Sequence, residues 1–282
     1  MLHKDSNRET VKSIRRRRLK IIDFHVHTFP EKIAEKAIAT LKAKSHTENF
    51  LDGTIKTLVG SMKSAGINFS VLQPVATKPE QVQSINNNAI KINSKYENII
   101  SFGAIHPDFK NFHEELKRIS QAGIKGIKLH PVYQGVNADD ERYIEILRCA
   151  NECNLAVLIH AGRDIGFPND DKALPEKILK AIKSAPETKI ILAHMGGWRC
   201  WNEAEKLFAD IENICIDTAF SFEYLGEENF VRMIKRFGSE RVLFGTDSPW
   251  SSQTESVEKI KLLPLTDSEK EKILYSNAKQ II

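Results

Sequence analysis

The sequence contains no apolar stretch long enough to span a membrane, and its N-terminal region is too charged for a signal peptide. Its four cysteines show no Cys-x-x-Cys spacing, so we expect reduced, partly buried thiols and no disulfide framework. No strand-like segment is followed by Gly-x-Gly-x-x-Gly, which disfavours a Rossmann-type nucleotide enzyme. Together these absences indicate a cytoplasmic protein that has no membrane partner.

Basic charge is concentrated near one end of the chain. Much of the formal net charge of +4 comes from the run Arg15–Arg18 with Lys20, and the remainder is near neutral. A nucleic-acid-binding protein would carry basic charge on its folded face, so no nucleic-acid partner is expected. We predict a solvated basic N-terminal extension over residues 1–18 and a single domain over residues 19–282.

Short apolar runs alternate with amphipathic stretches along the rest of the chain. The runs are nearly continuous in Ile, Val, Leu and Phe, as expected for parallel strands that are buried on both faces. We expect strands at residues 20–25, 67–73, 99–105, 124–130, 155–160, 188–193, 213–217 and 241–246. We expect helices at residues 79–96, 112–121, 139–153, 175–184, 199–210, 227–237, 254–262 and 265–282.

This alternation predicts an α/β fold, a (β/α)8 TIM barrel with a parallel eight-stranded barrel, and the chain length suits it. The insertion over residues 29–66 is longer than one helix, so we expect two extra helices after the first strand. Residues 265–282 are expected to form a closing helix, with Thr266 as its N-cap and Glu269 three residues later.

Side chains that can bind a metal follow most of the predicted strands. The carboxyl ends of the strands of a parallel barrel meet at one face, where imidazoles and a carboxylate would converge on a catalytic divalent ion. The residues concerned are His25, His27, His106, His130, His160, His194 and Asp247. Each histidine taken alone could instead be a hydrogen-bonded core residue, and Asp247 could cap a helix before Pro249. The repeated placement favours a shared metal site.

The combination of a first-strand His-x-His, a fifth-strand histidine, a sixth-strand histidine and an eighth-strand aspartate resembles the amidohydrolase superfamily. It is similar to the amidohydrolase-related branch that includes aminocarboxymuconate semialdehyde decarboxylase, whose C-terminal helix also resembles residues 273–278. The resemblance covers about residues 19–282 and implies one divalent metal, Zn²⁺ or alternatively Mn²⁺. It implies the ligands His25, His27, His160 and Asp247, with His194 beside the metal-bound water as an acid or base or as an electrostatic partner.

The chemistry of these side chains agrees with that assignment. Neutral imidazoles and a carboxylate suit zinc and leave room for a water. A divalent metal lowers the pKa of such a water from 15.7 to about 7, and Asp247 is placed to accept its proton. Lys128 leaves an alternative open, because some superfamily members carry a modified lysine on the fourth strand that bridges two metals.

Other side chains near strand ends are predicted to bind the substrate. We expect Lys128 and His130 to give the pocket its polarity, and Arg163 to grip a carboxylate unless it forms a surface salt bridge. His106 is expected in the pocket or in a structural role. Aromatic residues after strand ends are expected to wall the pocket or to pack the loops; they are Tyr133, Trp198, Phe220 and Trp250.

Three functions remain open from the sequence. The first is hydrolysis of a small carboxylated amide, lactone or ester by a metal-activated water. The second is a non-oxidative, metal-dependent decarboxylation on the same scaffold, and the third is a catalytically silent metal-binding barrel. The expected partner is a small molecule with a carboxylate, and residues 29–66 offer a surface for a homodimer. Specificity in such folds lies in the loops, so the substrate does not follow from the fold.

Overall fold

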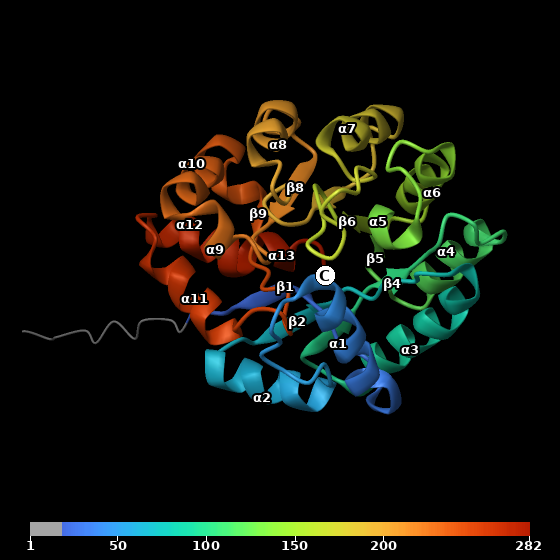
Figure 1. Cartoon of the computed structure of the whole chain (residues 1–282), viewed down its shortest axis with the longest axis horizontal. Coiled ribbons are helices and arrows are strands. Elements are labelled where there is room, and N and C mark those ends of the chain that lie inside the picture. Colours follow the sequence, from blue (N-terminus) through green and yellow to red (C-terminus); the bar gives the residue numbers. More distant parts are fainter. Residues whose placement is uncertain (1–18) are drawn as a thin grey trace, which may run out of the picture.

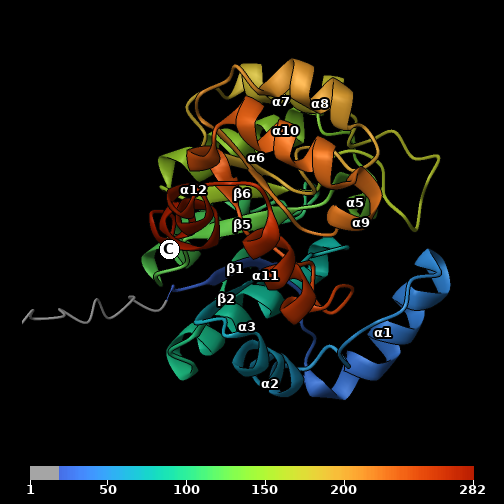
Figure 2. The same ribbon diagram turned by 90° about the vertical axis from the view of Figure 1, so that its left-hand side faces the viewer.

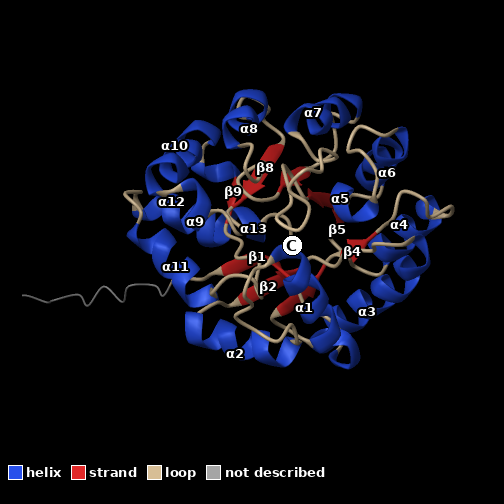
Figure 3. Ribbon diagram, viewed as in Figure 1, coloured by secondary structure: helices blue, strands red, loops and turns tan. Residues whose placement is uncertain are grey.

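The computed structural model describes residues 19–282, and the basic extension predicted for residues 1–18 lies outside the described residues. Its strands run parallel and occupy the centre of the molecule, with helices around them (Figure 1; Figure 3). They are β1 (Ile22–Val26), β2 (Phe69–Leu72), β3 (Ile99–Ser101), β4 (Gly103–Ala104), β5 (Gly126–Leu129), β6 (Ala156–Ile159), β7 (Ile190–Leu192), β8 (Ile214–Asp217) and β9 (Val242–Leu243).

The strands form two ladders in sequence order, β1 to β3 and β4 to β9. The strand predicted over residues 99–105 is divided at Phe102, whose backbone N–H donates to the carbonyl of Leu72 at 3.0 Å. At the other junction Phe24 donates to the carbonyl of Phe244 at 2.7 Å, so β1 is joined to the chain that follows β9. The structure confirms the predicted (β/α)8 architecture.

Helices follow the strands as the hydrophobic pattern predicts, and both helices expected within residues 29–66 are present. The main helices are α1 (Glu31–Ser45), α2 (Ile55–Ala65), α3 (Val82–Lys95), α4 (Phe112–Gln121), α6 (Glu141–Glu152), α7 (Pro175–Ser184), α8 (Trp201–Phe208), α10 (Glu227–Phe237) and α11 (Gln253–Leu262). Two short helices that the pattern did not indicate are α5 (Pro131–Gln134) and α9 (Phe222–Leu225). Among residues 19–282, no helix has the length and hydropathy to cross a membrane.

The closing helix is less regular than predicted. It begins with α12 (Asp267–Glu271), continues as a π-helical turn (Lys272–Ser276) and ends with α13 (Asn277–Lys279). The predicted capping box is present, since Thr266 accepts from the backbone of Glu269 and the Glu269 side chain accepts from that of Thr266. The buried Asn277 amide donates to two carbonyls beside β9, which fastens this segment to the barrel.

The interior of the barrel is filled by side chains from alternate strand positions. Phe24 and Phe102 lie edge to face with ring centroids 5.5 Å apart, and both are fully buried. Ile22, Val71 and Leu243 belong to the same apolar cluster. This packed apolar interior leaves the ends of the strands as the place for an open polar site. All four cysteines are free thiols, in agreement with the prediction.

Helix α1 differs from the helices that pack along the barrel. It stands away from the body of the molecule (Figure 2), and only Ala34 and Ile38 among its residues are buried. The other face of the helix is therefore available to line a cavity.

Candidate metal centre

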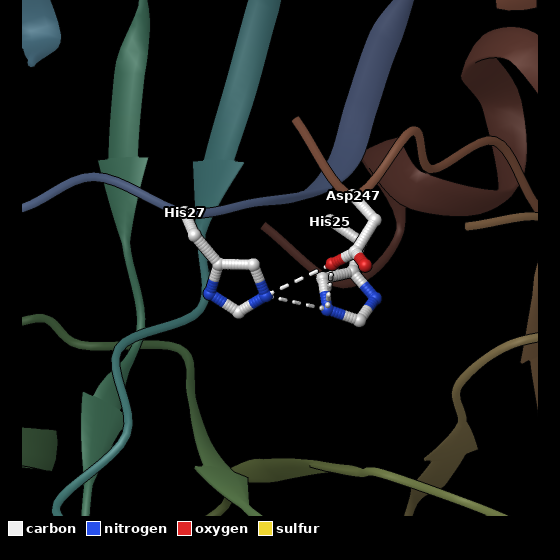
Figure 4. Close-up of side chains that lie close together, drawn as sticks. All are labelled: His25, His27 and Asp247. Carbon is white, nitrogen blue, oxygen red and sulfur yellow. Dashed lines mark hydrogen bonds and ion pairs between the residues drawn. The ribbon is translucent and has the colours of Figure 1, made fainter. Parts of the chain in front are cut away.

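Three of the predicted metal ligands meet at the carboxyl end of β1 (Figure 4). The Nε2 atoms of His25 and His27 lie 3.1 Å apart. Asp247 Oδ1 is 3.0 Å from His27 Nε2 and 3.5 Å from His25 Nε2. Asp247 is no helix cap, because the next helix, α11, takes Ser252 as its N-cap.

The orientation of His25 is fixed by a carboxylate that the sequence reasoning did not single out. Asp217, fully buried at the end of β8, accepts a hydrogen bond from His25 Nδ1 at 2.7 Å. With Nδ1 carrying the proton, the Nε2 lone pair of His25 faces His27 and Asp247. Histidines that bind a metal usually donate the N–H of their other ring nitrogen to a carboxylate or carbonyl in this way. The signal was present, since the run Ile-Cys-Ile-Asp also ends in a metal-capable side chain.

The charge states of this group suit a divalent cation. Burial, together with the positive charge of Lys128, lowers the pKa of His25 well below its usual value, so the ring is neutral. Burial raises the pKa of Asp247, but the hydrogen bond from His27 and the charge interactions with His25, His27 and His194 together outweigh it and bring the pKa to about 2. A cation at this point would displace the proton that His27 shares with Asp247, as metal binding to imidazole requires.

His160 and His194 meet beside this group, and the ring centroids of His194 and His25 are 5.4 Å apart. His194 Nδ1 donates to the carbonyl of Ala219 at 2.9 Å, and His160 Nε2 donates to that of Arg163 at 3.2 Å. The remaining nitrogens, His194 Nε2 and His160 Nδ1, each keep a lone pair and lie 3.1 Å apart. Two lone pairs at this distance repel unless a proton or cation interacts with them, so both nitrogens fit a metal centre.

The backbone is strained where it presents two of these side chains. His194 has φ 59° and Asp247 has φ 63°, the left-handed region that residues other than glycine rarely adopt. The backbone of His194 is held in this conformation by the Asp217 carboxylate, which accepts a hydrogen bond from the N–H of His194 at 2.9 Å. The N–H of Asp247 donates to the carbonyl of His25 at 2.8 Å. Such strain persists where surrounding hydrogen bonds impose it, and it concentrates at functional sites.

Lys128 lines the cavity and is almost fully buried. It is 1% exposed, and its Nζ is 3.2 Å from His25 Nε2. Burial lowers the pKa of Lys128 to about 8, although the nearby Asp217 and Asp247 carboxylates oppose the shift. The ammonium group thus adjoins the proposed ligands.

A second cluster adjoins the first and contains a carboxylate that the sequence reasoning missed. The rings of His130 and His160 stack at 4.0 Å, and Asp164 Oδ2 lies 3.6 and 3.7 Å from their Nε2 atoms. His130 Nδ1 accepts from the N–H of Tyr133 at 3.4 Å, so its Nε2 carries the proton and is a donor. Burial raises the pKa of Asp164 to about 6. Asp164 belongs to a loop, where no strand pattern marks it.

The predicted metal ligands, His194 and the predicted substrate-binding residues line one cavity of about 1000 Å³. The predicted substrate-binding members are Lys128, His130, Tyr133, Arg163, Trp198 and Trp250, with Phe220 beside them. Arg163 Nη1 donates to the carbonyl of Pro168 at 3.1 Å and forms no ion pair within residues 19–282. The buried indole N–H of Trp198 has no acceptor in that part of the chain.

His106 does not line this cavity. Its Nδ1 accepts a hydrogen bond from the N–H of Asp108 at 3.1 Å, which is a structural role.

Solved structures share this fold over nearly the whole chain. An uncharacterised TIM-barrel protein from Bordetella bronchiseptica has a TM-score of 0.74 at 20% identity, covering 93% of this chain and 98% of that one. 5-Carboxyvanillate decarboxylase from Sphingomonas paucimobilis has a TM-score of 0.69 at 17% identity, covering 93% and 98%. The Novosphingobium aromaticivorans enzyme of the same name, solved with manganese, has a TM-score of 0.70 at 15% identity, covering 92% and 95%. At these identities the likeness shows the fold.

Sequence comparison adds a local match and a family assignment. Dihydroorotase from Helicobacter pylori strain HPAG1 is 34% identical over 94 residues, which is 30% of this chain and 27% of that protein. The chain thus spans about a quarter of the length of the curated relatives it matches. The amidohydrolase family profile, by contrast, matches residues 22–282 and confirms the superfamily predicted from the strand-end side chains. The chain belongs to the amidohydrolase family of enzymes.

Proposed function

We propose that this enzyme is a metal-dependent carboxy-lyase, which removes a carboxyl group from a small aromatic carboxylic acid without oxidation. The observation that carries the proposal is the convergence of His25, His27 and Asp247 on the floor of an aromatic-walled cavity. The likeness of the whole fold to decarboxylases, one solved with manganese, supports this reaction class. Zn²⁺ and Mn²⁺ are both compatible with a site of imidazoles and a carboxylate.

The proposed metal ligands are the four residues His25, His27, His160 and Asp247. A divalent ion bound by them would hold and polarise the oxygen atoms of the substrate. Lys128 supplies positive charge beside this position, and the Nε2–H of His130 supplies a hydrogen bond for a substrate oxygen. These groups would orient an anionic substrate and exclude neutral ones.

The decarboxylation breaks the bond between the ring carbon and the carboxyl carbon. The electron pair stays on the ring carbon, which takes up a proton, and carbon dioxide leaves. We assign the proton transfer to His194, because its Nδ1–H is fixed on the carbonyl of Ala219 and its Nε2 faces the centre. Nε2 would therefore first take up a proton from solvent and then deliver it to the ring carbon.

A second candidate is hydrolysis of a small carboxylated amide, lactone or ester. The local match to dihydroorotase favours it, although that match covers 30% of this chain. In this reaction Asp247 or His194 would accept a proton from water instead of delivering one to carbon.

Product analysis distinguishes the two reactions. The protein, loaded with Mn²⁺ or Zn²⁺, would be incubated separately with 2,6-dihydroxybenzoate, 5-carboxyvanillate and dihydroorotate. The masses of the products would be measured by mass spectrometry. Loss of carbon dioxide without uptake of water supports the carboxy-lyase, whereas uptake of water contradicts it and supports the hydrolase. Absence of bound metal and of any turnover would contradict both and favour a silent barrel.

A further inference from the structure

The cavity is much larger than the metal centre needs. Its volume of about 1000 Å³ lies at the upper end of the range for ligand pockets, roughly 300–1000 Å³. A small ring with one carboxylate would leave most of this space empty. The remaining space, here called the outer half, is lined by residues of α1 and α3: Ile33, Lys36, Ala37, Thr40, Leu41, Ser84, Ile85, Asn87, Asn88 and Lys91.

Helix α1 turns an apolar stripe toward the outer half. Ile33, Ala37 and Leu41 recur every four residues, so they share one face of the helix, and all three line the cavity. This face is distinct from the one that buries Ala34 and Ile38. Ile33 is 51% exposed, so apolar surface stays in contact with solvent in the free protein. At about 1.5 Å per residue, the stripe from Ile33 to Leu41 is about 12 Å long.

The position of α1 connects the outer half to the metal centre. The helix begins three residues after Thr28, which follows the ligand His27, and both residues line the cavity. Near its other end, Lys44 Nζ lies 4.9 Å from the ring centroid of Phe167 and 6.0 Å from that of Tyr133. Helix α1 therefore spans the mouth of the cavity, and its stripe continues from the reacting end of the site.

Charge is divided unequally between the two ends of the cavity. The acidic side chains that line it, Asp164 and Asp247, both lie at the metal end. The outer half contributes Lys36 and Lys91, and neither lysine forms an ion pair in the described part of the chain. The outer half is therefore positive, and its serine and asparagine side chains add further hydrogen-bond donors.

We propose that the outer half binds the second, anionic end of an elongated dicarboxylate substrate, whose apolar middle lies along Ile33, Ala37 and Leu41. The first carboxylate would sit at the metal centre, and in this respect the inference rests on the proposed function. Lys36 and Lys91 would then determine specificity and not reaction chemistry. Substrates with a single carboxylate would bind at the metal end alone.

Binding of simple carboxylates by calorimetry tests this subsite. The full chain, loaded with Mn²⁺, would be titrated with succinate, suberate and octanoate. Suberate and octanoate share the apolar chain, but only suberate carries a second carboxylate. We expect suberate to bind up to about fivefold more tightly than octanoate, near the upper end of the gain that exposed ion pairs provide. The double variant Lys36→Gln, Lys91→Gln should abolish this difference and leave succinate binding unchanged.

Matched controls separate this subsite from general charge effects. Lys32 on α1 and Lys95 on α3 do not line the cavity, so Lys32→Gln, Lys95→Gln should leave the preference for suberate intact. The inference would be overturned if suberate bound no better than octanoate, or if the preference for suberate survived in Lys36→Gln, Lys91→Gln. In either case, retained binding of succinate would still support a carboxylate site at the metal centre. Loss of succinate binding in metal-loaded protein would overturn the proposed function as well.

Discussion

The metal centre and the outer half of the same cavity are held in place in opposite ways. At the metal centre His25 and His194 are buried, and each is oriented by a hydrogen bond through its second ring nitrogen. In the outer half the α1 stripe is partly exposed, and one end of the helix is held by cation–π contacts of Lys44. The barrel thus fixes the chemistry, while an insertion shapes the space for the substrate.

The difference follows from the way each region is supported. The centre draws its residues from the ends of β1, β6 and β8 and from the segments after β7 and β9, so many strands hold it. In the outer half, α3 packs through buried residues, but α1 has few buried side chains of its own. Substitutions should therefore act on metal binding and stability in the first region, and mainly on ligand affinity in the second.

Removal of a proposed ligand should have the largest effect. His160→Ala deletes the Nδ1 lone pair that faces His194, and we expect bound metal to fall from about one equivalent to a small fraction. Metal content after gel filtration, measured by plasma mass spectrometry, checks this. His113→Ala, on α4 away from the cavity lining, is the control and should retain its metal. Unchanged stoichiometry in His160→Ala would remove His160 from the metal centre.

Loss of the support behind His25 should be the next largest effect. Asp217→Asn leaves every proposed ligand in place but weakens the hydrogen bond that fixes the His25 tautomer. We expect metal affinity to fall about 10- to 100-fold. Competition with a fluorescent chelator measures it. Asp210→Asn, which removes a surface ion pair with Arg236, should change the affinity little. Equal affinities of the two variants would contradict the supporting role.

Stability should separate the barrel interior from the α1 stripe. Phe24→Ala leaves a void in the packed interior, and we expect a loss of about 3–5 kcal/mol in the free energy of unfolding. Leu41→Ala, on the cavity face of α1, should cost about 0.5 kcal/mol or less. Urea unfolding followed by circular dichroism compares them. Similar losses would show that α1 is as firmly packed as the barrel.

The smallest effect is expected from the contact that holds the end of α1. Lys44→Gln removes the cation over Phe167 and Tyr133, a contribution of about 0.5–1 kcal/mol at exposed sites. Hydrogen exchange should become faster over α1 and stay unchanged in β1. Lys42→Gln, whose lysine pairs with Glu48 outside the cavity lining, serves as the control. If the rate of hydrogen exchange in α1 were the same in both variants, the contact of Lys44 would not hold the end of the helix.

The sequence predicted the barrel better than the surroundings of the site. Apolar runs locate strands, and strands place their end residues at one face, so His25, His27 and Asp247 could be brought together from the sequence. Asp217 also ends a strand-like run, but its role is to support His25, and which histidine a buried carboxylate supports depends on tertiary structure. Asp164 could not be found in this way, because a loop residue reaches the site through the path of its loop and not through periodicity.

The outer half shows the same limit. The sequence predicts the helix α1, but its own periodicity does not say that Ile33 and Leu41 face a cavity while Ile38 packs against protein. That division depends on where the helix lies across the barrel mouth, which tertiary contacts such as those of Lys44 decide. The predicted pocket aromatics do line the cavity, because each follows a strand end.

The central claim is that one divalent ion is held by His25, His27, His160 and Asp247. Two neighbouring groups could hold an ion, one of His25, His27 and Asp247 and the other of His130, His160 and Asp164. Crystals grown with Mn²⁺ and measured near its absorption edge distinguish them by anomalous difference density. The account predicts one peak, bonded to His25, His27 and Asp247 with His160 Nδ1 completing the site. A peak within the second group, two peaks bridged by Lys128, or no peak would contradict it.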